Sequence, residues 1–243
     1  MINNYFILNV YDKKNISSKL VSQLIYGEKF KTIKKYKNWL KIKCINDNYI
    51  GYIKKRKFEP YFAPTHKINK LFTYLHKRPN KISKMKKKIS FGSKIKIIEK
   101  KNNFYKFDNY WVKKKDTDLI NISYKKIFLK IKNFNGVKYK WGGRSFNGLD
   151  CSALVQLFFN FNNKFCPRDT KDQIKYFKKK VNIRNIKKND LIFWKGHVAI
   201  TLSRNKLIHA YGPLKKVVIM NISKTIKRIE NTAKLKVIGI RRT

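Results

Sequence analysis

Residues 139–155 read YKWGGRSFNGLDCSALV, and this stretch carries the pattern that decides the fold. Two glycine turns lead to Asp150 and Cys151, and apolar residues at helical spacing follow them. The spacing predicts a helix that starts near Cys151, with Asp150 as its N-cap. Because the free N–H groups and the dipole at a helix N-terminus favour negative charge, we expect a lowered pKa and a more nucleophilic thiol at Cys151. The alternative is a buried cysteine in an ordinary packed helix.

Two of the four histidines lie further along the chain, in a predicted β-hairpin. Residues 197–202 and 206–211 alternate in polarity, as strands with one buried face do. If the loop has three residues, His209 pairs opposite Ala199 and shares a face with His197, about 7–8 Å away at the backbone. One ring could then orient the other. A two-residue loop would place them on opposite faces, and a lone histidine is usually an ordinary polar residue.

The order of these motifs resembles the NlpC and p-sixty family of cell-wall cysteine peptidases. The matching blocks are Tyr139–Gly143, Asp150–Ser152, Gly196–Val198 and Ile208–Ala210. The resemblance extends over residues 134–222 and includes the loop and helix of residues 167–173. One departure is Ala153, where the family usually has glycine, and a methyl group there is easily tolerated in a first helical turn.

The resemblance implies a papain-like fold and amide hydrolysis through a thioester. Cys151 would be the nucleophile, His197 the base that takes its proton, and His209 the group that orients His197. The Tyr139 hydroxyl and the backbone N–H of Cys151 would stabilise the oxyanion; the alternative for Tyr139 is a core aromatic residue. This chemistry needs no metal and no cofactor, and the sequence has no CxxC metal spacing.

The resemblance also implies a substrate class, peptidoglycan stem peptides cut after γ-D-glutamate, typically with a free N-terminal L-Ala. The substrate-binding residues would be Asp150, Ser152, Glu28, Trp141 and Arg168. Glu28 and Asp150 would meet the ammonium group of the peptide, and Trp141 would shape the wall of the cleft. The alternatives are a solvent-facing turn residue for Glu28, a simple N-cap for Asp150 and a loop-anchoring role for Arg168.

The chain before residue 121 reads as two copies of a small β-rich module. In the first copy, turn residues separate short predicted strands over 10–11, 19–24, 29–34, 39–45 and 49–53. Gly27, Ile33, Trp39 and Ile42 recur 65 positions later as Gly92, Ile98, Phe104 and Phe107. The pattern resembles bacterial SH3-like domains, and chance similarity between β-rich segments is the alternative. We therefore expect an α+β protein, with all-β SH3-like barrels at 1–62 and 63–120 and an NlpC-type papain-like domain at 121–243.

Three further elements are predicted in the C-terminal domain. Apolar residues at helical spacing predict a lead-in helix over 124–134, and strands are expected over 217–222 and 235–240. Among the remaining cysteines, Cys44 lies in an alternating strand and is expected in the core, whereas Cys166 has no assigned role.

The net charge is +47, from 60 basic and 13 acidic residues. The lysines are spread over the whole chain, which favours compositional bias over a dedicated polyanion site, although non-specific polyanion binding is expected. Three cysteines are too few for a disulfide framework. No apolar run reaches the length of about 18 residues that an integral membrane segment needs. Residues 1–14 lack the features of a signal peptide, which favours a bacterial cytoplasmic protein.

The main expectation is a cysteine endopeptidase that acts on peptidoglycan-derived peptides in muropeptide recycling. An acyltransferase or amidase on the same fold stays open, because the acceptor site is not visible in the sequence. A non-catalytic polyanion- or cell-wall-binding protein is the other alternative. The intact set of Cys151, His197 and His209 argues against it.

Overall fold

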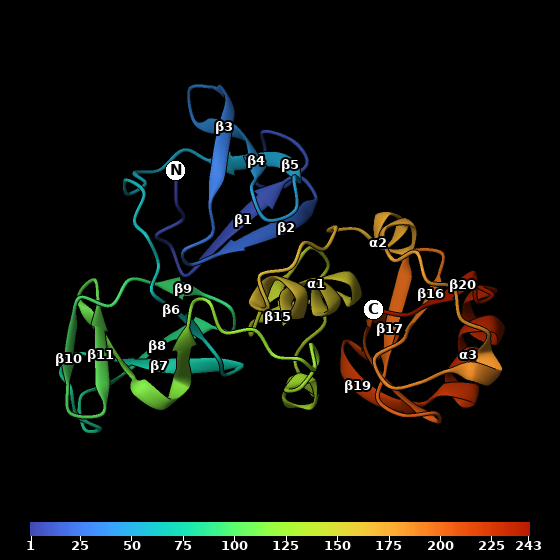
Figure 1. Ribbon diagram of the computed structural model, residues 1–243. Coiled ribbons are helices and arrows are strands. Elements are labelled where there is room, and N and C mark those ends of the chain that lie inside the picture. Colours follow the sequence, from blue (N-terminus) through green and yellow to red (C-terminus); the bar gives the residue numbers. More distant parts are fainter. The chain divides into compact units, whose positions relative to one another are not determined.

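Figure 1 shows a computed structural model that describes residues 1–243 and divides into two compact units. The first unit contains Met1–Ser123, Arg144–Phe146 and Phe161–Asn163. The second unit contains Tyr124–Gly143, Asn147–Asn160 and Lys164–Thr243.

The N-terminal part of the first unit is a five-stranded antiparallel sheet. Its strands are β1 Ile7–Tyr11, β2 Leu20–Ile25, β3 Phe30–Lys35, β4 Trp39–Cys44 and β5 Ile50–Lys54, in the order β2-β1-β5-β4-β3. Each strand overlaps one that the sequence predicted. Every second residue of β4, namely Leu40, Ile42 and Cys44, is buried in the core. The prediction of a core position for Cys44 is therefore confirmed.

The rest of the first unit is also all-β. Its elements are β6 His66–Ile68, β7 Phe72–His76, β8 Lys84–Ser90, β9 Lys94–Ile95, β10 Glu99–Lys101, β11 Phe104–Phe107, β12 Tyr110–Lys113, the 3-10 turn η1 Lys114–Asp116 and β13 Thr117–Leu119. They form two sheets, β10-β11-β12-β7-β8 and β13-β6-β9. Gly27 and Gly92, equivalent in the proposed repeat, both have a left-handed backbone, with φ of +80° and +78°. The domain boundaries themselves stay a prediction.

The second unit is built around another five-stranded antiparallel sheet, β19-β18-β17-β16-β20. Its strands are β16 Leu191–Trp194, β17 His197–Thr201, β18 Lys206–Tyr211, β19 Lys216–Asn221 and β20 Gly239–Arg241. The helices are α1 Cys151–Phe161, α2 Thr170–Tyr176 and α3 Ile222–Ala233. Shorter elements of this unit are η2 Ile131–Phe134, β15 Gly148–Leu149, η3 Ile183–Asn185 and η4 Gly212–Leu214, whereas β14 Arg144–Ser145, the partner of β15, belongs to the first unit.

The two local predictions that matter most for the site are confirmed. Helix α1 begins at Cys151. In the β17–β18 hairpin, Ile200 pairs with Ile208 and Thr201 with Leu207, which is the register expected for a three-residue loop. By strand alternation, the two histidines of this hairpin share a face.

The predicted helix over 124–134 is wrong. This segment forms turns that end in the 3-10 helix η2, with i→i+3 bonds such as Leu129 N–H to the Lys126 carbonyl at 3.0 Å. Phe128, Ile131 and Phe134 are nevertheless buried. The apolar pattern therefore marks the buried side correctly, but consecutive tight turns can present the same side without an α-helix.

Helix α3 was not predicted. The strand expected over 235–240 is shorter in the structure, where β20 begins at Gly239 and ends at Arg241. The predicted strand over 217–222 ends at Asn221, because its side chain caps α3 by accepting the Lys224 N–H at 3.0 Å. Ile222 and Ile229 pack into the core on the sheet. This seven-residue apolar spacing, behind an asparagine cap, was the sequence signal for the helix.

Candidate active site

Cys151 is the first residue of α1, and its side chain is almost fully buried. The preceding Asp150 caps the helix, because its Oδ1 accepts the Ala153 N–H at 2.9 Å. The thiol points to the Gly196 carbonyl, with 3.9 Å between Sγ and O. Since Gly196 directly precedes β17, the thiol lies next to the start of the strand that carries His197.

The pKa of Cys151 differs from the expectation of a lowered value. The pKa of Cys151 is raised to about 12, chiefly by burial and next by the neighbouring Asp150 carboxylate. Backbone N–H groups of Val198 and Ser152 and the charge of Arg168 lower it, but by less. In this dry site the cost of removing a thiolate from water exceeds the benefit of the helix terminus.

His197 and His209 are in direct contact. The His197 Nε2 and His209 Nδ1 atoms are 2.9 Å apart. His209 is fully buried, its ring stacks on Tyr211 at 4.7 Å between centroids, and its Nε2 lies 3.4 Å from the Met220 Sδ. His209 therefore fixes the Nε2 side of the His197 ring, and the His197 Nδ1 is left for another partner.

Both imidazoles are neutral in the folded protein at pH 7. Burial lowers the pKa of His197 from 6.5 to about 4. Burial and the proximity of His197 lower the pKa of His209 to about 2. The resting pair is thus a thiol beside a neutral imidazole, which can act as a base.

Asp150, Ser152 and Arg168 form one buried network. The Arg168 guanidinium donates to both carboxylate oxygens of Asp150, at 3.0 and 2.5 Å, and to Ser152 Oγ at 2.8 Å. Asp150 Oδ2 also accepts the Gly142 N–H at 2.9 Å. These contacts support an N-cap role for Asp150 and an anchoring role for Arg168, because the two buried side chains form an ion pair with each other.

Gln173 of α2 ties the following loop to the same network. Its Nε2 donates to the carbonyls of Ser152 and Pro167 at 3.0 and 2.9 Å. Cys166 is fully buried beside it, with 3.6 Å between Gln173 Nε2 and the sulfur. Cys166 is therefore part of the packing behind α1.

Tyr139 and Trp141 lie on the chain that leads to α1. Burial raises the pKa of the Tyr139 phenol, and the nearby Cys151 and Asp150 raise it further, so the hydroxyl stays protonated and can donate. Trp141 is 53% exposed. Gly143 is required for packing, because a Cβ there would lie 2.4 Å from the Gly148 carbonyl oxygen.

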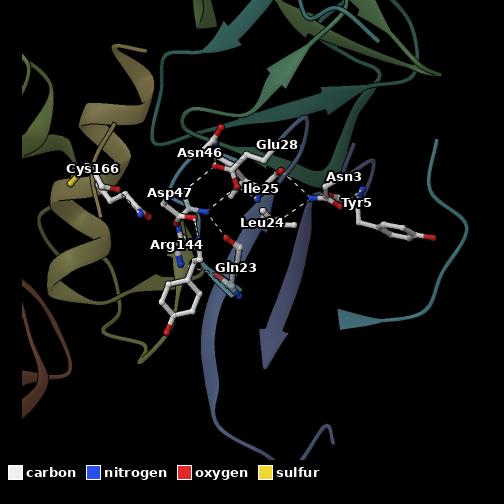
Figure 2. Close-up of polar contacts among 12 residues, drawn as sticks. Asn3, Tyr5, Gln23, Leu24, Ile25, Glu28, Asn46, Asp47, Arg144 and Cys166 are labelled. Atoms are coloured by element: carbon white, nitrogen blue, oxygen red, sulfur yellow. Dashed lines mark hydrogen bonds and ion pairs between the residues drawn. The ribbon is translucent and has the colours of Figure 1, made fainter. Parts of the chain in front are cut away.

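Glu28 belongs to the first unit, and its surroundings are shown in Figure 2. Its carboxylate is 2% exposed and pairs with both terminal nitrogens of Arg144 at 2.9 Å. It also accepts bonds from the Ile25 N–H at 3.0 Å and the Asn46 amide at 2.9 Å. The alternative of a solvent-facing turn residue is therefore wrong.

Two residues of these networks, Arg144 and Met220, were missed at the sequence level. The partner of Arg144, Glu28, lies 116 positions earlier in the chain, and the partner of Met220, His209, lies on the neighbouring strand. No local sequence pattern therefore marks either residue.

Residues 1–243 contain no group of three or more His, Cys, Asp or Glu side chains arranged to hold a metal ion. None of the helices combines the length and apolar character needed to cross a membrane.

Two family models match the chain. Residues 136–233 match the NlpC/P60 family, and residues 10–58 match the bacterial dipeptidyl-peptidase SH3 domain. The first match covers the segment with Cys151, His197 and His209, and the second covers β2 to β5 and the end of β1.

Curated relatives and a solved structure agree with these matches. The γ-D-glutamyl-L-lysine dipeptidyl-peptidase of Bacillus subtilis is 27% identical over 84% of this chain and 77% of its own length. The dipeptidyl-peptidase 6 of Lysinibacillus sphaericus is 36% identical, but over 30% of this chain and 27% of its own length. A crystal structure of an NlpC/P60 family protein from Bacillus cereus superimposes with a TM-score of 0.84 at 18% identity, over 99% of this chain and 98% of that one.

The structural match confirms the predicted fold, a papain-like NlpC-type domain that follows an all-β SH3-like region in the sequence. The chain thus joins an SH3-like region of the dipeptidyl-peptidase type to a domain of the NlpC/P60 family of cell-wall peptidases.

Proposed function

We propose that this protein is a cysteine peptidase that hydrolyses peptidoglycan stem peptides after γ-D-glutamate. The observation that carries the proposal is the placement of the Cys151 thiol beside the start of β17, whose His197 is held by His209 at 2.9 Å. The similarity to the Bacillus subtilis protein, which is named a γ-D-glutamyl-L-lysine dipeptidyl-peptidase, supports this substrate class. A cytoplasmic location and a role in recycling free peptides belong to the same proposal.

The proposed reaction proceeds through a thioester. His197 takes the proton of Cys151 as the sulfur attacks the carbonyl carbon of γ-D-glutamate. The backbone N–H of Cys151 and the Tyr139 hydroxyl donate to the oxyanion. His197 then returns the proton to the leaving amine, and a water molecule hydrolyses the thioester with His197 again acting as base.

The hydrogen-bond chain behind His197 favours one tautomer. A thioether sulfur has no proton to give, so the contact with Met220 places the hydrogen of His209 on Nε2. His209 Nδ1 then accepts, and His197 Nε2 donates to it. This leaves His197 Nδ1 unprotonated, as a base requires.

Replacing Met220 with leucine is expected to lower kcat by about two- to tenfold with little change in KM, because one weak hydrogen bond that fixes the tautomer is lost. Nitrogen NMR of the histidine rings should show a mixed tautomer at His209. Met85→Leu, the same substitution in the first unit, is the control. An unchanged His209 tautomer in Met220→Leu would remove Met220 from the mechanism.

As the pH falls, kcat/KM is expected to drop near pH 4, where His197 is protonated, and not near pH 6.5. Burial lowers the pKa of His197 to about 4, so the base stays neutral down to that pH. Between pH 6.5 and 4 the unfolded chain takes up a proton at His197 that the folded chain does not, so folding stability falls as the pH falls through this window. An acid limb at or above pH 6.5 would contradict a neutral His197.

In this proposal, residues close to Cys151 in the sequence contact the substrate. Trp141, with its exposed ring, forms an apolar wall of the cleft. Asp150 and Ser152 lie beside the nucleophile and orient the amine end of the peptide, while Arg168 holds Asp150 in place. The assignment of Glu28 to the ammonium rests on the family resemblance, since its observed partners are Ile25, Asn46 and Arg144.

The test compares L-Ala-γ-D-Glu-meso-diaminopimelate with its N-acetylated form as substrates. We expect kcat/KM to be at least tenfold lower for the acetylated peptide than for the free peptide, because acetylation removes the charged amine that the site recognises. A tenfold difference corresponds to about 1.4 kcal/mol. Trp141→Ala should raise KM for both peptides. Equal rates for the two peptides would support the peptidase activity but contradict recognition of the amine. Cleavage of neither peptide would contradict the proposed function.

A further inference from the structure

A pocket of about 500 Å³ lies in the first unit, and none of its lining residues is assigned to catalysis above. It is lined by Lys81, Asn103, Phe104, Lys113, Lys114 and Lys115. Pairing of β11 with β12 brings Phe104 opposite Lys113, and the Lys114 N–H donates to the Asn103 carbonyl at 2.9 Å. Backbone bonds thus fix the wall that carries most of the lysines.

The four lysines of this pocket have no carboxylate partner in the structure. None of them takes part in the ion pairs that Lys106, Arg144, Arg168 and Arg242 form with carboxylates. Asp116, which directly follows the lysines in the chain, is buried and accepts the Thr73 hydroxyl at 2.6 Å. Four lysines that line one hollow, without a carboxylate partner, create a positive potential there that favours an anion.

The remaining lining and the size of the pocket narrow the class of anion. Lysine is a common point-charge ligand of phosphate, whereas forked recognition of carboxylates favours arginine, and the lining contains none. Phe104 and the Asn103 amide add an apolar surface and a polar group, as sites for organic ligands have. The volume of about 500 Å³ is within the usual range for small-molecule sites and larger than one phosphate needs.

We propose that this pocket binds a small organic phosphate with two or more anionic groups, such as a nucleoside polyphosphate. A ligand of this kind places its phosphates among the lysines and its organic part against Phe104. The high charge of the chain produces weak binding of anions elsewhere on the surface, but that binding has neither a defined stoichiometry nor a concave site.

The test is calorimetric titration of the full chain with ATP, pyrophosphate and adenosine in 150 mM salt, a concentration at which surface charges are screened beyond about 8 Å. We expect one saturable site for ATP, weaker binding of pyrophosphate and no binding of adenosine. Several equivalent sites for ATP, or adenosine binding as tightly as ATP, would overturn the proposal.

A matched pair of variants separates the pocket from the general charge. Lys113→Gln/Lys115→Gln removes two charges at the pocket, and Lys31→Gln/Lys54→Gln removes two exposed charges from the first sheet. The pocket variant should weaken ATP binding at least tenfold (about 1.4 kcal/mol), and the control variant less than twofold. Equal weakening in both would show binding by net charge alone. Because all four side chains are at least partly exposed, both variants are expected to fold, which circular dichroism can verify.

Discussion

Cys151→Ala is expected to lower kcat/KM by about 10⁴-fold or more, to the level left by binding alone. The substitution removes the sulfur that forms the thioester, whereas a methyl group fills the first turn of α1 without strain. Cys151→Ser should be nearly as inactive, since an alkoxide is harder to generate than a thiolate beside a neutral His197. Peptide cleavage followed by chromatography measures both variants.

The other two cysteines provide the control for this prediction. Cys44 and Cys166 are buried in the first sheet and behind α1, and neither carries a mechanistic role. Their alanine variants should keep kcat within a few-fold if they fold. Full activity in Cys151→Ala would rule out the thioester mechanism.

Arg144→Met is expected to destabilise the first unit by about 3–5 kcal/mol, because it leaves the buried Glu28 carboxylate without its partner. A loss of this size corresponds to a fall in Tm of roughly 6–20 °C. The Arg144 side chain is 2% exposed and also donates to the Gln23 carbonyl, so water cannot replace these bonds readily. Thermal unfolding followed by circular dichroism measures the effect.

A double-mutant cycle identifies the ion pair as the cause. Glu28→Gln/Arg144→Met removes both charges and should be less destabilised than Arg144→Met alone, because no buried charge is left unpaired. Lys106→Gln, which breaks the solvent-exposed pair with Glu99, should change stability little. If the double variant lost as much as the sum of both single variants, the two side chains would not be coupled.

The parts of the fold and site that the sequence predicted are those governed by local rules. The start of α1 follows from Asp150 as a cap and the apolar spacing after Cys151. The contact between His197 and His209 follows from the length of one hairpin loop, because the loop fixes which residues share a face.

The parts that the sequence did not predict depend on burial and on partners far away in the chain. The pKa of Cys151 was expected to fall because only the helix terminus was visible, and desolvation reverses the sign. The buried state of Glu28 depends on Arg144, 116 positions later. Residues 124–134 show that a helical apolar pattern can also be met by consecutive tight turns.

The most direct test of the central claim is mass spectrometry of the products formed from L-Ala-γ-D-Glu-L-Lys by the wild-type protein and by Cys151→Ala. The account predicts release of L-Ala-γ-D-Glu and free lysine by the wild-type protein, and an intact peptide with the variant. Cleavage between L-Ala and D-Glu, or release of lysine that persists in Cys151→Ala, would contradict it.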